Sequence, residues 1–315
     1  MSGIRIKGTG CFLPRQVVTN EDLSRIVETN DEWIYTRTGI RERRRCTAES
    51  QCEMALYAAQ KAMEAAGVGV ADIGVCLVPT ITPDYITPST ACVLQKRLGL
   101  MEDTVCFDLN AACSGFVFGL HTAQALLACS SRKYGLIVCS EVLTRITDYA
   151  DRGTCILFGD GAGAAVVEYS GQYPAMPAVL GARGEENFLY GPGIGRGQPP
   201  VLHMGGTQVF KFAVETVPEC IYKVLDLAGL QVKDVNQFVF HQANRRILER
   251  IMKKVGIPEE KVWMNMERCG NVSSASTAIA LDEVIRAGRL LPGQKALCCA
   301  FGGGLTWAGA LVELA

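Results

Sequence analysis

Two stretches decide the fold: AAGVGVADIGVCLVPT, residues 65–80, and LAGLQVKDVNQFVFHQ, residues 227–242. At an offset of 162 residues, three pairs are identical: Ala66 and Ala228, Gly67 and Gly229, and Asp72 and Asp234. Each stretch predicts the end of an amphipathic helix, a glycine stop, a polar link and a buried strand. The sequence therefore predicts two α/β halves of common ancestry, with mixed sheets covered by helices.

The repeat extends further along the chain. GLIVCSE (135–141) matches KALCCAF (295–301), and GAAVVEY (163–169) matches AGALVEL (308–314). The second pair has the smaller offset, so the first half carries an insertion of about 16 residues within 141–160. Loops that accept such insertions often carry function.

The two halves differ where their paired strands end. The expected helices and strands are 51–66 with 73–79, and 215–228 with 235–241. At the end of these strands, Pro79 in the first half corresponds to His241 in the second. The polar sequence HQANRRI begins at His241 and has no counterpart in the first half.

Composition excludes several classes of protein. The chain has 315 residues, 49% of them hydrophobic, and a net charge of -1, which favours a large core and argues against nucleic-acid binding. No run of 18 apolar residues exists, so we expect no membrane span. The first residues lack an apolar signal core, so a cytoplasmic protein with reduced thiols is expected. Only three histidines and no CxxC motif are present, which argues against a zinc site.

Cys113 lies in DLNAACSGFVFGL (108–120), between a predicted strand and a predicted apolar helix. At such a turn, the helix dipole and unpaired N–H groups favour the thiolate. Small neighbours leave room for a substrate to approach the sulfur. The residues alone leave two interpretations open: a nucleophile, or one more packed thiol among 14 cysteines.

Three histidines and one asparagine are candidate partners of that thiol. His241 is favoured as an acid–base group or oxyanion stabiliser, because it joins a buried strand to a polar turn. His121, in the apolar helix, is expected to be a core residue, and His203, in VLHMGGTQVFKF, a structural residue in a strand or loop. Asn271, in CGNVSSAS, precedes a helix expected over 278–287, where a helix cap is its simpler role.

Six motifs in order resemble the β-ketoacyl-[acyl carrier protein] synthase III family: DEWIYTRTGIRER, NAACSGF, DRGTCILFGDGAGA, HQANRRI, GNVSSAS and FGGGLTWAGALV. The resemblance runs nearly end to end. It implies an α/β thiolase-like fold of five αβαβα layers, with pseudo-twofold-related halves at 1–172 and 173–315. It also implies a homodimer, which the sequence by itself does not show.

The family pattern implies a Cys–His–Asn triad of Cys113, His241 and Asn271. Cys113 would take the acyl group from a primer acyl-CoA, and the N–H groups of Cys113 and Gly303 would form an oxyanion hole. Malonyl-carrier protein would then lose CO₂, and the enolate, held by His241 and Asn271, would attack the acyl-cysteine. No metal or redox cofactor is expected, since acyl-CoA enters as a substrate.

Asn271 also separates the related families. Elongating ketosynthases have a second histidine at that place, so an asparagine favours the initiating type. Thiolases need a second cysteine near the C-terminus, and FGGGLTW has none. Decarboxylative condensation is therefore preferred over thiolysis.

The resemblance also implies a CoA site. Trp33 would stack on the adenine, with Arg37 and with Arg152 of the insertion near it. The polar sequence NDEW favours an exposed Trp33 over a buried one. Four further residues match positions along the pantetheine tunnel: Thr29, Met204, Ala243 and Asn244.

The basic stretch RRILERIMKK (245–254) predicts a helix with Ile247, Leu248 and Ile251 on its inner face. The polar face is open to two interpretations: an ordinary solvated surface, or a dock for the acidic carrier protein. The dock would consist of Arg246, Arg250, Lys253 and Lys254. Arg246 matches a family position with that role, and a local patch can steer a charged partner.

Two further stretches bear on ligands. GDGAGA (159–164) fits a dinucleotide fingerprint, but AAVVEY after it predicts a strand where a Rossmann turn opens into a helix, so no NAD site is expected. In DYITPST (84–90), Thr87 stands where many relatives carry a phenylalanine that closes the partner subunit's acyl pocket. We therefore expect acyl groups longer than acetyl to be accepted, unless Tyr85 or Ile86 fills the gap.

Three functions remain from the sequence. The first is the initiating ketosynthase of fatty acid synthesis. The second is a condensing enzyme or acyltransferase of secondary metabolism in the same family. The third is a silent scaffold that only binds carrier protein, and the intact Cys–His–Asn set argues against it.

Overall fold

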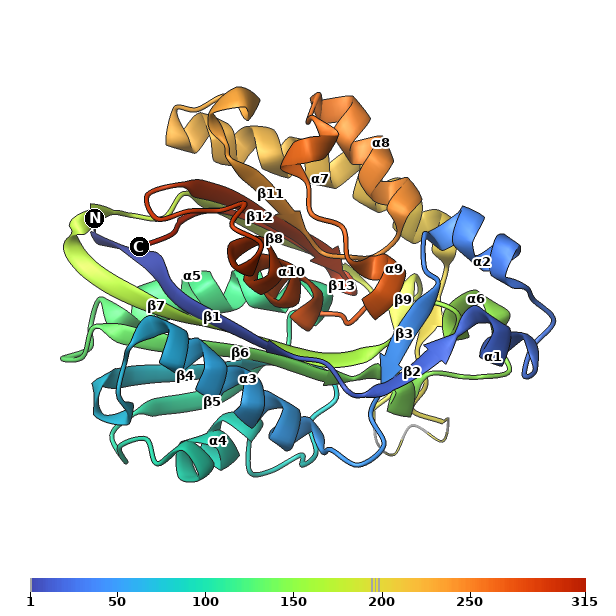
Figure 1. The fold of residues 1–315 in the computed structure, drawn as a ribbon, viewed down its shortest axis with the longest axis horizontal. Helices are drawn as coiled ribbons and strands as arrows, with labels where there is room; N and C mark the ends of the chain where they lie inside the picture. The colour runs from blue at the N-terminus through green and yellow to red at the C-terminus, as the bar shows by residue number, and fades with distance from the viewer. Residues whose placement is uncertain (1, 194, 196, 198) are drawn as a thin grey trace.

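Two mixed β-sheets lie face to face, with helices between them and on their outer faces (Figure 1). This computed structural model describes residues 2–193, 195, 197 and 199–315. The first sheet contains, in order, β1 (Ser2–Phe12), β7 (Asp160–Pro174), β6 (Tyr134–Val142), β4 (Ile73–Pro79) and β5 (Val105–Leu109). The second contains β11 (Gln237–Phe240), β12 (Lys295–Gly302), β13 (Gly304–Glu313) and β8 (Ala178–Glu185).

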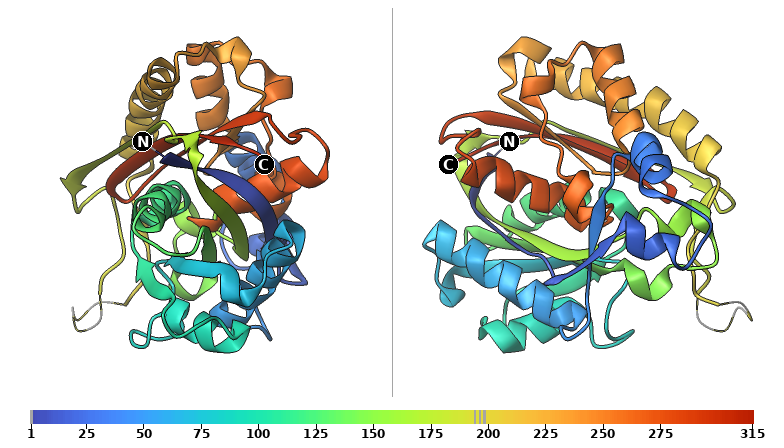
Figure 2. Two further views of the ribbon diagram at one scale, coloured as in Figure 1. Left: turned by 90° about the vertical axis from the view of Figure 1, so that its left-hand side faces the viewer. Right: turned by 45° about the vertical axis from the view of Figure 1, so that its right-hand side comes forward.

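Helices complete the layers (Figures 1 and 2). α3 (Gln51–Ala66) and α4 (Thr90–Leu98) cover the outer face of the first sheet. α5 (Gly115–Leu127) and α10 (Ala275–Arg286) lie between the sheets, and α7 (Gly206–Ala228) covers the outer face of the second, with α8 (Arg245–Val255) packed beside it. This αβαβα arrangement confirms the predicted fold. None of the described helices is long and apolar enough to cross a membrane.

The two sheets share one connectivity, which confirms the internal repeat. The order β4, β6, β7, β1 in the first sheet corresponds to the order β11, β12, β13, β8 in the second. In each of these orders the first two strands are parallel and the other neighbours are antiparallel. β5 adds a further edge strand to the first sheet only, parallel to β4. The proposed boundary between residues 172 and 173 falls inside β7, and the chain crosses to the second sheet between β7 and β8.

Short elements gather at one end of the sheets, as Figure 1 shows. They are β2 (Gln16–Thr19), α1 (Asn20–Ser24), α2 (Asp31–Thr38), β3 (Glu42–Arg45), α6 (Arg152–Cys155), β9 (Leu189–Tyr190), β10 (His203–Met204) and α9 (Met266–Cys269). The insertion between β6 and β7 contributes a turn, η3 (Leu143–Ile146), and α6, whereas only Gly303 separates β12 from β13. The insertion thus extends the first half toward this end.

The first helix and strand of the repeat form where predicted, α3 over 51–66 and β4 over 73–79. Ser50 and Glu53 make a capping box at the start of α3, and Gly67, with φ 62°, ends it in the left-handed region. Every residue of β4 is buried, because helices cover both faces of the sheet.

The second copy differs from prediction at two boundaries. α7 begins at Gly206, not at 215, and β11 is shorter than predicted, spanning Gln237–Phe240. The interpretation of 201–212 as strand or loop holds only for β10, because the residues after Gly205 begin a long helix whose buried face includes Val209, Phe212 and Ala213. The glycine pair marks a helix start.

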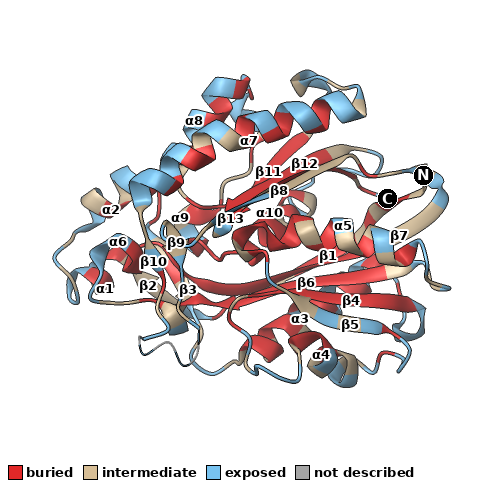
Figure 3. Ribbon diagram, turned by 180° about the vertical axis from the view of Figure 1, so that it is seen from behind, coloured by how far each residue is buried: buried red, intermediate tan, exposed pale blue. Residues whose placement is uncertain are grey.

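Of the remaining predictions, the strand after GDGAGA is confirmed and the burial of His121 is wrong. The residues of GDGAGA from Asp160 onward lie in β7, so a strand follows the glycines as predicted. His121 was expected in the core but is exposed on α5. Its helix is buried between the sheets along one side, and His121 faces away from that side. Cys113, by contrast, is buried in the turn that precedes α5. Figure 3 shows that α5 is itself partly buried between the sheets.

Candidate active site

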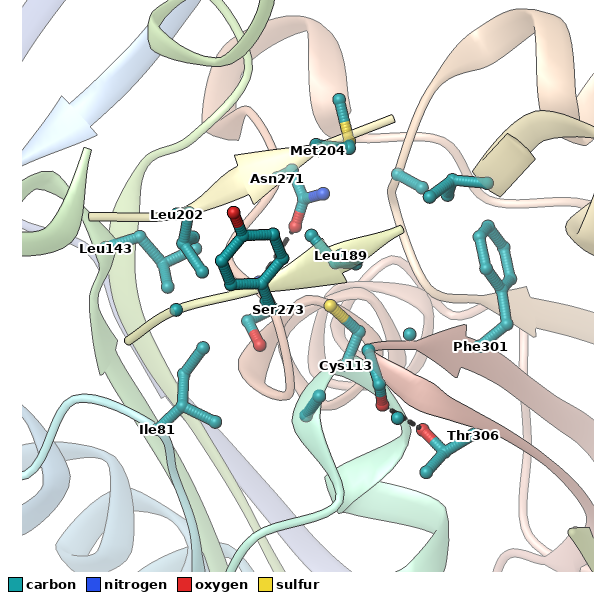
Figure 4. Close-up of a pocket in the computed structure, with 18 of the residues that line it drawn as sticks. Ile81, Cys113, Leu143, Leu189, Leu202, Met204, Asn271, Ser273, Phe301 and Thr306 are labelled. Atoms are coloured by element: carbon teal, nitrogen blue, oxygen red, sulfur yellow. Dashed lines mark hydrogen bonds between the residues drawn. The ribbon is translucent and has the colours of Figure 1, made fainter. Parts of the chain in front are cut away.

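One pocket of about 1070 Å³ collects the predicted catalytic residues (Figure 4). Cys113 comes from the turn η2 (Ala112–Ser114) between β5 and α5, and His241 follows β11. Asn271 precedes α10, and Gly303 joins β12 to β13. The pocket therefore lies where the two halves meet, with the cysteine from one and the histidine and asparagine from the other. Among the described residues, no group of His, Cys, Asp or Glu side chains could hold a metal ion.

The turn that carries Cys113 is tightly packed. Ala112 before it has φ 45°, a conformation that non-glycine residues seldom adopt and that tends to occur at functional sites. A Cβ on Gly302 would lie 2.8 Å from the Cys113 backbone nitrogen and 2.9 Å from its Cβ. Glycine is therefore required there, and it allows the Gly302–Gly304 turn to approach the sulfur-bearing residue.

Cys113 is 8% exposed, and its sulfur faces Asn271 and Ser273 (Figure 4). Burial raises the pKa of the thiol to about 12, the nearby Ser273 side chain lowers the pKa, and the Glu141 carboxyl raises it further. Burial thus favours the thiol and opposes the effect of the helix terminus, which by itself favours the thiolate.

His241 is neutral. It is 1% exposed, and its backbone N–H donates to Cys299 O at 2.9 Å. Its ring packs edge-to-face with that of Phe301, with the ring centres 5.7 Å apart. Burial lowers the pKa of the imidazole to about 3, and a backbone hydrogen bond with Ser273 opposes this shift. At neutral pH this ring can donate one hydrogen bond or accept one without carrying a charge.

Asn271 is held in one orientation by backbone contacts. Its N–H donates to Leu157 O at 2.9 Å, and its carbonyl accepts from Gly159 N at 2.9 Å. Its side-chain Oδ1 accepts from Ser273 N at 2.9 Å. Because Oδ1 is occupied, the amide nitrogen Nδ2 is the group left to act as a donor in the pocket.

Two residues of the site were missed in the sequence. Ser273 is 1% exposed and lines the pocket beside Cys113. Glu141, fully buried at the end of β6, accepts hydrogen bonds from Thr82 Oγ1 at 2.8 Å and Ser274 Oγ at 2.7 Å. Burial raises the pKa of this carboxyl. The motif GNVSSAS offers three serines without distinguishing them, and Glu141 was noticed only as part of the repeat.

The expected CoA-binding residues form a cluster beside the pocket. Trp33 is partly exposed on α2, and two guanidinium groups lie close to its ring centre, that of Arg37 at 4.4 Å and that of Arg152 of α6 at 4.5 Å. Asn244 Nδ2 donates to Arg37 O at 3.0 Å, which links this cluster to the pocket wall. Asn244, Ala243 and Met204 line the pocket. Thr29 precedes α2 and is not among the lining residues.

The basic helix has the predicted faces. Ile247, Leu248 and Ile251 of α8 are buried. The expected carrier-protein residues are all exposed: Arg246, Arg250, Lys253 and Lys254. Within the described chain, none of these four forms an ion pair. Asn244 caps the helix by accepting from Arg246 N at 2.9 Å, so α8 starts at the pocket wall.

Thr87 does not reach the pocket of its own chain. It lies exposed in the loop before α4, beside Tyr85 and Ile86, which are 50% and 80% exposed. The apolar end of the pocket is lined instead by Ile81, Leu143, Phe158, Leu189 and Leu202. A role for Thr87 in the acyl pocket therefore requires a second subunit.

Comparison with known proteins agrees with this architecture. The family described as 3-oxoacyl-[acyl-carrier-protein (ACP)] synthase III matches residues 107–184, and its C-terminal counterpart matches residues 225–314. A protein of Alkalilimnicola ehrlichii named beta-ketoacyl-[acyl-carrier-protein] synthase III is 44% identical over 322 residues, covering 99% of this chain and 100% of that protein.

Solved structures show the same likeness. The crystal structure of 3-oxoacyl-[acyl-carrier-protein] synthase III from Aquifex aeolicus VF5 has a TM-score of 0.93 at 39% identity, covering 99% of this chain and 100% of that one. The priming β-ketosynthase of the R1128 polyketide biosynthetic pathway has a TM-score of 0.94 at 37% identity, covering 99% and 96%. Since the identity extends over nearly the whole chain and the layers agree, this protein belongs to the β-ketoacyl-[acyl-carrier-protein] synthase III family.

Proposed function

We propose that this protein starts fatty acid synthesis by condensing an acyl-CoA primer with malonyl-acyl carrier protein. The products are a 3-oxoacyl-carrier protein, CO₂ and CoA. The observation that supports this most is the meeting of Cys113, His241 and Asn271 in one pocket between the two halves. The names of the relatives support the same reaction.

In the first half-reaction, Cys113 exchanges one thioester for another. Its sulfur attacks the acyl-CoA carbonyl, the C–S bond to CoA breaks, and the thiol proton ends on the CoA sulfur. The negative oxygen formed in between accepts hydrogen bonds from the N–H groups of Cys113 and Gly303. The close approach of Gly302 to Cys113 supports this pair of donors.

In the second half-reaction, malonyl-carrier protein loses CO₂ and leaves an enolate. Nδ2 of Asn271 and Nε2–H of His241 donate to the thioester oxygen, where the charge develops. The low pKa of His241 supports this role, because a neutral donor stabilises the enolate without protonating its carbon. The carbon then attacks the acyl-cysteine and releases its sulfur.

We further propose a homodimer joined through β5, the free edge of the first sheet. Val105 and Phe107 of this strand are 46% and 37% exposed. Figure 3 shows exposed residues along β5. Unpaired edge strands with exposed apolar side chains favour pairing with another chain. Asp108 of β5 accepts from Thr90 N at 2.7 Å, which holds the loop with Thr87 beside this edge. A dimer would thus bring Thr87 toward the partner's pocket.

Two surfaces would bind the substrates. The Trp33 ring would stack on the adenine, and the guanidinium groups of Arg37 and Arg152 beside it would bind CoA phosphates. The exposed cations of α8 would hold the acidic carrier protein at the pocket wall. A cytoplasmic location, the site of such carrier proteins, completes this proposal.

The test is a condensation assay with malonyl-carrier protein and a series of acyl-CoAs from acetyl to decanoyl, straight and branched. We expect a 3-oxoacyl-carrier protein by mass spectrometry, and primers longer than acetyl should be used because Thr87 is small. In the Arg246→Glu/Arg250→Glu variant, the KM for malonyl-carrier protein should rise while acylation by acyl-CoA stays unchanged. A lack of product with every primer would contradict the function, and turnover of acetyl-CoA alone would contradict the role of Thr87.

A second candidate is a priming ketosynthase of secondary metabolism. It is favoured by one observation, the likeness to the R1128 polyketide priming enzyme at 37% identity. The same assay separates the two, by whether the carrier protein of fatty acid synthesis or only one of a polyketide pathway is accepted as the malonyl donor.

A further inference from the structure

Ser273 is placed unusually for a residue without an assigned role. Two non-glycine residues of the described chain have positive φ, Ala112 and Ser273, both at 45°. One precedes Cys113 in the first half, and the other follows Asn271 in the second. Because this conformation is costly for residues with a side chain, its occurrence on both sides of one pocket indicates that the fold maintains it for function.

The hydroxyl of Ser273 is buried and free to act. Ser273 is 1% exposed, and its Oγ has no hydrogen-bond partner by ordinary geometric limits among the described residues. Its backbone N–H is committed to Asn271 Oδ1 at 2.9 Å, which turns the side chain toward Cys113 (Figure 4). A buried hydroxyl without a partner is costly, so such a group calls for an explanation.

The surroundings of the Cys113 sulfur supply little positive charge. No lysine or arginine is found among the described residues that line the pocket, and His241 is neutral. The nearby carboxyl of Glu141 disfavours a negative sulfur, and so does burial. Neutral donors are therefore the groups available to stabilise a thiolate: the start of α5, the Ser273 hydroxyl, Asn271 Nδ2 and the His241 N–H. Of the three side chains, Ser273 is the one without a proposed role in the condensation.

We propose that the Ser273 hydroxyl is a catalytic group that donates a hydrogen bond to the Cys113 sulfur and stabilises the thiolate during acylation. This rests on the proposed role of Cys113 as nucleophile and adds a donor to it. The hydrogen bond is strong while the sulfur is negative and weak once the sulfur is acylated. Ser273 thus favours the attacking form of the cysteine over its thiol.

The test measures alkylation of Cys113 by iodoacetamide between pH 7 and 9, following the peptide that contains Cys113 by mass spectrometry. Ser273→Ala removes the hydroxyl, and Ser273→Gly removes it while accepting the positive φ without strain. In both, we expect the alkylation rate at each pH to fall about tenfold, since a hydrogen bond to a charged group is worth roughly that factor. Acylation by acyl-CoA should slow in parallel.

Thr277→Val is the matched control. Thr277 is fully buried, and its Oγ1 also lacks a partner among the described residues, but it lies outside the pocket lining. Its removal should leave alkylation unchanged. Parent-like alkylation in Ser273→Gly would overturn the proposal, whether or not Ser273→Ala folds. Alkylation does not depend on acyl-CoA. If the Ser273 variants are alkylated about tenfold more slowly, as expected, but acyl-CoA does not acylate even the parent, the result would count against the proposed function and not against the role of Ser273.

Discussion

His241 is a buried neutral base, and its protonation links the site to the stability of the fold. Burial lowers its pKa to about 3 from the ordinary 6.5, so between these values the unfolded chain binds a proton that the folded chain does not. Stability from this residue is complete above about pH 6.5 and is lost as the pH falls toward 3.

The first prediction follows from that linkage. Between pH 6 and 5, the unfolding free energy of the parent should fall by about 1.2 kcal/mol more than that of His241→Gln. Urea unfolding at both pH values measures this difference. His121→Gln removes an exposed histidine and should behave like the parent. Equal slopes for the parent and His241→Gln would show that the ring titrates normally in the folded protein.

Single residues also show which properties of the site can be predicted from the sequence. Cys113, His241 and Asn271 were identified by type and motif, and the structure brings them together. The thiol's protonation and the role of Ser273 were not predictable. Both depend on burial and on a backbone conformation that the other half of the molecule imposes. One serine in GNVSSAS carries no sign of its φ.

At the scale of elements, the turn between β12 and β13 decides whether the site can form. A Cβ at Gly302 would meet backbone atoms of Cys113, at 2.8 Å from its nitrogen and 3.2 Å from its Cα, and neither can move freely. In the proposed reaction, this close contact would keep the N–H of Gly303 near the carbonyl that Cys113 attacks.

The second prediction concerns this turn. Gly302→Ala should lower kcat/KM by about 100-fold, the cost of misplacing reacting groups by about 1 Å. Steady-state condensation assays measure it. Gly171→Ala on β7 is the control, because its Cβ would meet only Ser2 Oγ at 3.9 Å, and its activity should equal the parent's. A fully active Gly302→Ala would mean that the turn can retreat and that its closeness has no role.

Elements of the repeat were predicted unevenly for a physical reason. α3 and β4 carry local start and stop signals, Ser50 and Gly67, and a wholly buried strand, so the sequence identifies them. The sequence does not predict the first two turns of α7, because they begin at a glycine pair and their apolar residues are equally compatible with a strand or loop. Only the packing of Val209 and Phe212 against the second sheet makes them helical.

At the scale of the whole molecule, β5 is the edge through which we expect two copies to associate. Its apolar residues Val105 and Phe107 are exposed, and the Thr87 loop lies beside it. The division of the chain into halves follows from the repeat. The expected dimer cannot be predicted from the repeat, because the sequence of β5 resembles that of any buried strand.

The third prediction tests the edge. Phe107→Asp should convert a dimer to a monomer in analytical ultracentrifugation, because a charge in the paired edge is desolvated on association. Condensation activity should fall with it. Leu227→Asp changes an apolar residue that is 64% exposed at the end of α7 and should leave the mass unchanged. A Phe107→Asp protein that remains dimeric would place the interface elsewhere.

In the proposed reaction Cys113 receives the acyl group, and the intact mass of the protein after brief incubation with acyl-CoA shows whether it does. We expect one acyl adduct on the parent and none on Cys113→Ser. Cys129→Ser, the control, removes an exposed thiol instead of the buried one and should carry the adduct like the parent. An adduct that persists in Cys113→Ser, or its absence with every acyl-CoA from acetyl to decanoyl, would contradict the account.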